Sequence, residues 1–129
     1  MQKTVKISEI IDLREIADEL RGKTLPLPGA YKLTKIINNL EKDFNFYSEK
    51  FQEIVATYAQ KNEDGSYKFS EDGEQILIQT DKIDECNQKL EELLDLEVTL
   101  DNLDFSIENL GENFECTPND LEKLMPFLN

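Results

Sequence analysis

The chain has 129 residues, of which 39% are hydrophobic and 33% are charged, and its formal net charge is −14. This length fits one compact domain, and so acidic a surface repels nucleic acid and anionic membranes. No stretch approaches the roughly 20 apolar residues that a membrane helix needs, and the N-terminus holds no apolar run of signal-peptide length. We therefore expect one domain over residues 1–129, in the cytoplasm, without direct contact to nucleic acid or membrane.

Residues 1–29 predict a short strand, a short helix and a proline-rich linker. The segment TVKI alternates in polarity, as a strand does. Ser8 can cap a helix that Gly22 closes, and the linker KTLPLPG then favours extended backbone. The apolar face of this helix consists of Ile10, Leu13, Ala17 and Leu20.

Residues 30–61 carry the strongest periodic signal and predict one long helix. Apolar residues recur at alternating spacings of four and three over about four heptads, and Pro28 and Gly29 separate this pattern from the linker. The aromatic residues are bulky for a dimer seam, so the pattern favours packing within the chain over a dimer, although it is compatible with both. The helix seam comprises Leu33, Ile37, Leu40, Phe44, Tyr47, Phe51, Ile54 and Tyr58.

Residues 62–79 predict a β-hairpin, because two Asp-Gly turn signals bracket short alternating runs. Residues 80–96 predict a second helix with Thr80 as its N-cap. We expect this helix to pack antiparallel against the C-terminal half of the long helix.

Residues 97–110 read as one or two further strands, and residues 117–128 as a C-terminal helix. Thr117 is the expected cap of that helix, with Pro118 at its first position. The sequence thus predicts a mainly α, α+β fold. It consists of a long helix in an antiparallel helical hairpin, a small antiparallel sheet from the hairpin and the 97–110 strands, and short flanking helices.

The side chains that commonly carry chemistry are few. The chain has no histidine, so the commonest general base is absent, and it has no phosphate-binding glycine loop. Cys86 and Cys116 are in no metal-binding spacing, and the partial calcium-loop pattern from Gln60 to Glu71 has Gln where the first ligand should be Asp. We expect no enzymatic activity, no metal and no cofactor.

The acidic residues gather in the second half of the chain, where residues 62–129 hold nineteen Asp/Glu and four Lys/Arg. Such a surface either keeps the protein soluble or docks on a basic groove of another protein. The candidate docking residues are Glu91, Glu92, Asp95, Glu97, Asp101, Asp104 and Glu108.

Short motifs follow one another along residues 30–128. They are Tyr31-Lys32-Leu33, Glu63-Asp64-Gly65-Ser66-Tyr67, the stretch from Ile83 to Leu94 with Leu-Glu-Val at 96–98, and Thr117-Pro118-x-Asp120-Leu121. In this order they resemble small uncharacterised proteins encoded by tailed bacteriophages. The resemblance implies a phage protein in the host cytoplasm, or one associated with the virion, and it supplies no catalytic residues.

Two functions are consistent with these features. The first is a non-enzymatic interaction or assembly module that binds a phage or host protein through the long helix and is able to self-associate. The alternative is an acidic inhibitor of a host nucleic-acid-processing or defence protein, of which nucleic-acid mimicry is one special form. The first is favoured, because acidity alone has a common explanation in solubility.

Overall fold

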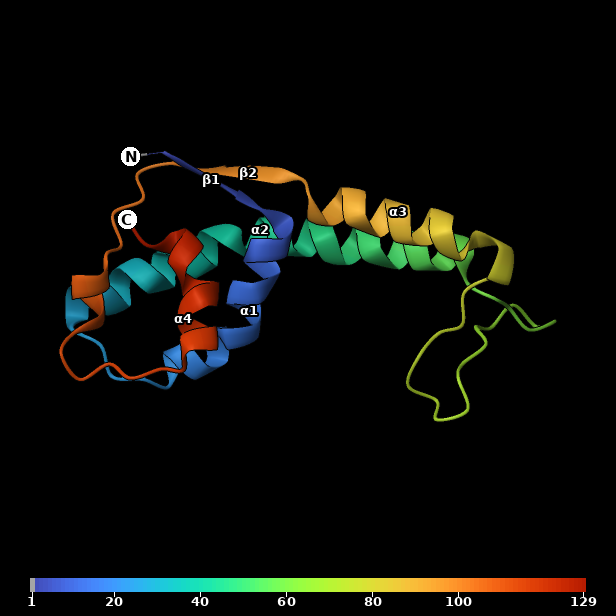
Figure 1. Cartoon of the computed structure of the whole chain (residues 1–129), viewed down its shortest axis with the longest axis horizontal. Coiled ribbons are helices and arrows are strands. Elements are labelled where there is room, and N and C mark those ends of the chain that lie inside the picture. The colour runs from blue at the N-terminus through green and yellow to red at the C-terminus, as the bar shows by residue number, and fades with distance from the viewer. Residues whose placement is uncertain (1) are drawn as a thin grey trace. The chain divides into compact units, whose positions relative to one another are not determined.

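The computed structural model describes residues 2–129 and has a mainly helical α+β fold (Figure 1). The long helix and the small antiparallel sheet predicted from the sequence are both present. The α-helices and strands are β1 (Lys3–Lys6), α1 (Ile7–Arg21), α2 (Leu27–Tyr58), α3 (Ile83–Leu94), β2 (Glu97–Leu100) and α4 (Pro118–Leu124). Three short 3-10 helices are η1 (Thr80–Lys82), η2 (Ile107–Leu110) and η3 (Met125–Phe127).

The chain forms two compact units, and α2 contributes to both. Unit 1 comprises residues 2–45 and 95–129, and unit 2 comprises residues 46–94. Of the described residues, eighteen hydrophobic side chains are buried, and fifteen of them lie in unit 1. Unit 1 therefore contains most of the hydrophobic core.

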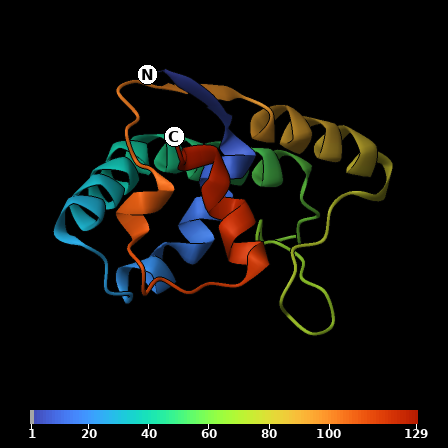
Figure 2. The same cartoon turned by 60° about the vertical axis from the view of Figure 1, so that its left-hand side comes forward.

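The core of unit 1 forms between α1, the first half of α2 and the C-terminal segment. The predicted apolar face of α1 is buried, and Phe105 and Phe127 are 0% exposed. Figure 2 shows α4 beside α1. At roughly 25 cal/mol per Å² of buried apolar surface, two fully enclosed phenylalanine rings contribute several kcal/mol.

The sheet in unit 1 differs from the predicted one. β1 pairs antiparallel with β2, with Lys3 opposite Leu100 and Lys6 opposite Glu97. The 97–110 region therefore supplies one strand of the sheet as predicted, but the predicted partner, the hairpin, is wrong. The strand ends at Leu100 because Asn102 adopts a positive φ of 56°, and η2 occupies the place of the second predicted strand.

Three helix starts also differ from the sequence prediction. α1 begins at Ile7, where the Lys6 N–H donates to Glu9 Oε1 at 2.9 Å, so Ser8 is not the cap. α2 begins at Leu27, because Pro28 lies in the first turn, where a missing N–H breaks no helical hydrogen bond. Thr80 is the first residue of η1 and not the cap of α3.

The C-terminal helix agrees with the prediction at its start. The Thr117 side chain accepts a hydrogen bond from the Asp120 N–H at 3.1 Å, and Pro118 is the first helical residue. The α-helix ends at Leu124 instead of residue 128, and η3 follows it.

Unit 2 consists of the second half of α2, α3 and the segment between them. Figures 1 and 2 show α3 running back along α2, as predicted for the helical hairpin. In the connecting segment, Phe69 pairs with Ile76 at a single bridge, so the predicted hairpin pairing is present there. Two further bridges join Ile78 to Ala59, the residue after α2, and Tyr67 to Lys61.

Candidate functional surfaces

The predicted helix seam has different surroundings in the two units. Leu33, Ile37 and Leu40 are buried in unit 1 at 4 to 5% exposure. Ile37 and Leu40 line a small pocket against α1 together with Leu13. The first half of the seam is thus used within the chain and is not available to a partner.

The second half of the seam is less covered. Phe44, Tyr47, Ile54 and Tyr58 are half-buried, and Phe51 is exposed. The rings of Tyr47 and Phe51 lie 5.8 Å apart between centroids. No seam residue of α2 after Leu40 is therefore buried in the part of the chain that the structure describes.

Unit 2 leaves several other large apolar side chains exposed. Of its described residues, the buried hydrophobic side chains are Ala59, Cys86 and Leu93. In contrast, Phe46 and Phe69 are 43% and 52% exposed. We call the exposed apolar residues of unit 2 its apolar surface; it consists of Phe46, Phe51, Phe69, Leu77 and Ile83.

A closed set of backbone hydrogen bonds holds the segment that carries Phe69 and Leu77. The Gln60 N–H donates to the Leu77 carbonyl at 2.8 Å, and the Leu77 N–H donates to the Lys68 carbonyl at 2.9 Å. The Lys68 N–H completes the ring by donating to the Gln60 carbonyl at 3.0 Å. Backbone bonding, rather than a side-chain core, therefore fixes this segment.

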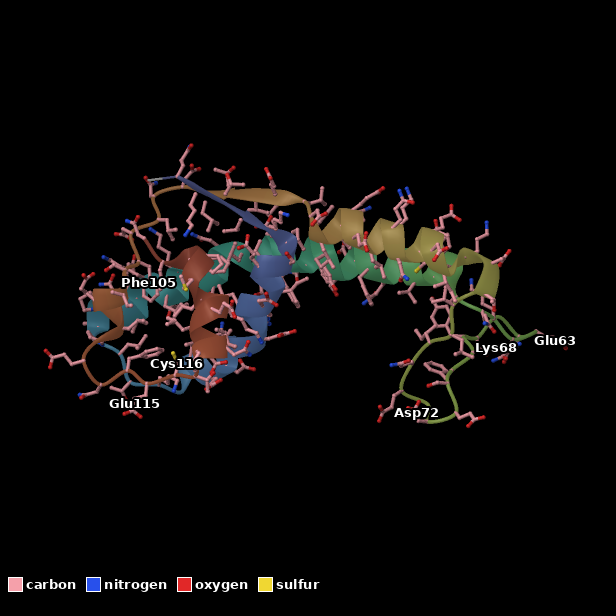
Figure 3. The ribbon with its side chains drawn as sticks, in the orientation of Figure 1. Glu63, Lys68, Asp72, Phe105, Glu115 and Cys116 are labelled. Carbon is pink, nitrogen blue, oxygen red and sulfur yellow. The ribbon has the colours of Figure 1, made fainter. Side chains whose placement is uncertain are left out.

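Two turns extend from this closed set of backbone hydrogen bonds. Figure 3 shows Glu63 in one turn and Asp72 in the other. Gly65 and Gly73 have positive φ, as the two Asp-Gly signals require. In the first turn, Asp64 Oδ1 accepts hydrogen bonds from the N–H and the hydroxyl of Ser66. These hydrogen bonds favour the carboxylate and lower the pKa of Asp64. The same residues made up the partial calcium-loop pattern, and here they serve turn geometry.

The seven acidic candidates are all exposed, but several have a cation beside them. Asp95 lies 3.6 Å from Lys6, Asp104 lies 3.5 Å from Lys32, and Glu92 lies 3.8 Å from Lys89. Glu91 and Glu92 belong to unit 2, whereas Asp95, Glu97, Asp101, Asp104 and Glu108 belong to unit 1.

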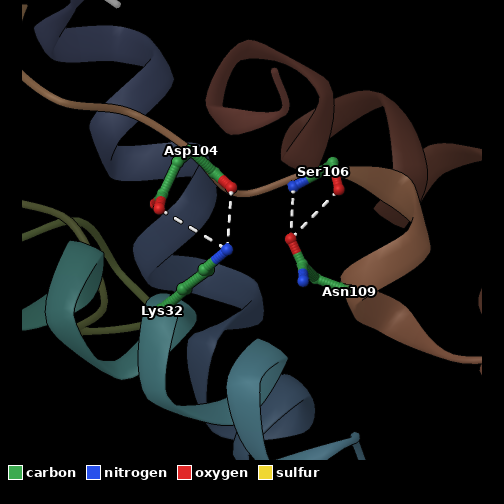
Figure 4. A network of polar contacts seen from close by, with 4 residues as sticks. All are labelled: Lys32, Asp104, Ser106 and Asn109. Carbon is green, nitrogen blue, oxygen red and sulfur yellow. Dashed lines mark hydrogen bonds and ion pairs between the residues drawn. The ribbon is translucent and has the colours of Figure 1, made fainter.

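A groove that the sequence did not predict lies in unit 1, between α2 and residues 98–104, with a volume of about 510 Å³. On the helix side, a row spaced by four residues lines it, namely Tyr31, Lys35, Asn39 and Asp43. Figure 4 shows one end of the strand side, where Lys32 Nζ contacts both the side chain and the carbonyl of Asp104. The sequence shows the spacing of the helical row and predicts a strand within residues 97–110, but it does not indicate that the two lie opposite each other.

Among residues 2–129, no group of three or more Cys, Asp or Glu side chains is arranged to hold a metal ion. In the same residues, no helix is both long and apolar enough to cross a membrane. Burial raises the pKa of the Cys86 thiol, which disfavours the reactive thiolate.

The features above define a small acidic α+β protein with an apolar surface on one unit and a groove on the other. The chain belongs to a family described as "Protein of unknown function (DUF1617)", whose model matches residues 1–117. No curated protein and no solved structure matches the chain. The family description names no activity.

Proposed function

We propose that the chain is a non-enzymatic, phage-encoded interaction and assembly module that binds through the apolar surface of unit 2. The observation that carries this proposal is the contrast between three buried hydrophobic side chains in that unit and five large exposed ones. Exposed apolar patches typically mark interaction sites. The phage context is taken from the resemblance of the sequence motifs.

The occupant that we propose for this surface is a second copy of the chain. A two-fold contact uses the same patch twice, so the exposed rings of one copy meet apolar surface on the other. Unit 2 holds twelve Asp/Glu and five Lys/Arg, and like charges therefore oppose the contact. Salt screens this repulsion, so self-association should be retained or strengthened as salt rises.

Sedimentation equilibrium with paired variants tests the proposal. Phe51→Ser combined with Phe69→Ser removes two rings from the apolar surface, whereas Ile107→Ser combined with Met125→Ser removes two exposed apolar side chains of unit 1. The first pair should weaken self-association by at least about tenfold, and the second should leave it within about twofold. Equal association of the two variants would refute the role of unit 2.

The acidic-inhibitor alternative has less support, because three of its seven carboxylates lie beside lysines. Charge reversal at Glu91, Glu92 and Asp95 separates the two functions. It should abolish binding by an inhibitor of a basic protein. It should leave self-association intact, because the apolar surface of unit 2 is unchanged.

A further inference from the structure

The two-stranded sheet of unit 1 has a free edge at β2. The Ile7 N–H donates to the Leu96 carbonyl at 2.9 Å, and this pair continues the register that joins Val5 to Val98. In an antiparallel ladder, hydrogen-bonded pairs alternate with non-bonded pairs. Val98 is therefore bonded to β1, whereas the backbone N–H and C=O of Thr99 point away from β1.

The groove runs along this free edge. Val98, Thr99 and Leu100 all line it, although consecutive side chains of a strand point to opposite faces. A groove that three consecutive residues line must follow the edge of the strand and not one of its faces. No described residue forms a hydrogen bond with the Thr99 N–H or C=O.

The opposite edge of the sheet is less available. There the Lys6 N–H, which points away from β2, already donates to Glu9 Oε1 at 2.9 Å. An unpaired strand edge is a template for another chain, and within the sheet of unit 1 it is the β2 edge that lies beside a groove.

From this arrangement we infer that the groove between α2 and β2 binds an extended segment of another protein, which adds a third strand to the sheet. Main-chain hydrogen bonds to Thr99 supply affinity, as in other cases of strand addition. β2 has four residues, so the paired part of the segment is of about the same length. This site is separate from the apolar surface of unit 2 and does not depend on it.

The walls of the groove indicate which side chains the segment carries. Ile36, Val98 and Leu100 are half-buried apolar residues of its lining, and they suit alternate β-branched side chains of the segment. The lining also holds two aspartates, Asp43 and Asp101, and a single lysine, Lys35, that forms no ion pair with a described residue. The expected ligand therefore alternates β-branched and basic residues.

Titration with a defined peptide tests this inference. The probe is the acetylated and amidated heptapeptide TVKVTVK, observed through the amide NMR signals of the isotope-labelled full chain. We expect saturable binding, a shift of the Thr99 amide signal and slower hydrogen exchange at Thr99.

Two probe versions, each N-methylated at one alternate set of residues, keep the side chains and remove one row of backbone N–H donors. One version should bind at least about tenfold more weakly and the other within about twofold of the parent.

Variants of the chain locate the site independently. Thr99→Pro removes the edge N–H without removing a donor from the β1–β2 ladder, and Thr99→Ala is the matched control that keeps it. Asn39→Trp fills the groove from an exposed position of α2. It serves as the test variant if Thr99→Pro disrupts the hydrogen bonds between β1 and β2. Thr99→Pro and Asn39→Trp should each weaken binding by at least about tenfold, and Thr99→Ala by less than about twofold.

The inference is overturned if about 1 mM probe leaves the Thr99 amide signal unchanged, because so weak a contact is no site. It is equally overturned if the shifts map to another part of the chain. Unchanged affinity of both Asn39→Trp and the N-methylated probes would also overturn it, since neither side-chain nor backbone contacts in the groove would then matter.

Discussion

Gly29 is the position at which a single added methyl group is least tolerated. It is buried in α2, and a Cβ there would lie 1.8 Å from the carbonyl oxygen of Asn109. We expect Gly29→Ala to lower the free energy of unfolding by about 3 kcal/mol, because backbone on both sides has to move. Urea denaturation measures this loss.

Gly65→Ala is the control for that substitution. Gly65 has a φ of +89°, and no other atom lies within 4 Å of the place that an added Cβ would take. Gly65→Ala should lower the free energy of unfolding by about 1 kcal/mol, because alanine is strained at this positive φ but meets no neighbouring atom. If the two alanine variants were equally stable, close packing of α2 against Asn109 would not be the reason for a glycine at position 29.

The two cysteines should differ in reactivity. Cys86 is 2% exposed and burial raises its thiol pKa, whereas Cys116 is half-buried. A raised pKa leaves less thiolate at a given pH, and the thiolate is the reactive form. In single Cys→Ser variants followed with Ellman's reagent, Cys86 should react at least about tenfold more slowly than Cys116. Equal rates would contradict the packing of α3.

At the scale of elements, the start of α4 depends on one hydrogen bond. Thr117 Oγ1 accepts a hydrogen bond from the Asp120 N–H at 3.1 Å. This N–H is one of the donors that a helix start leaves without an intrahelical partner. Thr117→Ala should lower the free energy of unfolding by about 1 kcal/mol, and Thr117→Ser should restore most of it. A thermal melt in which serine is no better than alanine would argue against the cap.

Local sequence signals predicted some elements and not their partners. The heptad pattern identified α2, and Thr117-Pro118 identified the start of α4, because periodicity and caps are local properties. The pairing of β1 with β2 joins residues nearly a hundred positions apart, and no local signal specifies it. The groove was missed for the same reason, since one of its walls is this strand.

The helix seam illustrates the same limit. Its sequence pattern is uniform from Leu33 to Tyr58, yet its first half is buried in unit 1 and its second half is partly exposed. Periodicity indicates which residues share a face, and it does not indicate how much of that face another element covers.

At the scale of the whole molecule, the two units should differ in local stability. Unit 2 has three buried hydrophobic side chains among its described residues, against fifteen in unit 1. Regions with few buried contacts open at lower free energy. In dilute solution, native-state hydrogen exchange should give α3 amides an opening free energy about 2 kcal/mol or more below those of α1. Equal protection of the two helices would contradict this difference.

The central claim is that the apolar surface of unit 2 drives self-assembly, and light scattering over a concentration series tests it most directly. The molar mass of the wild-type chain should rise above the 15.0 kDa of one copy, and the rise should be at least as large at about 300 mM salt as at about 50 mM. A molar mass of one copy at every concentration and both salt levels would contradict the account.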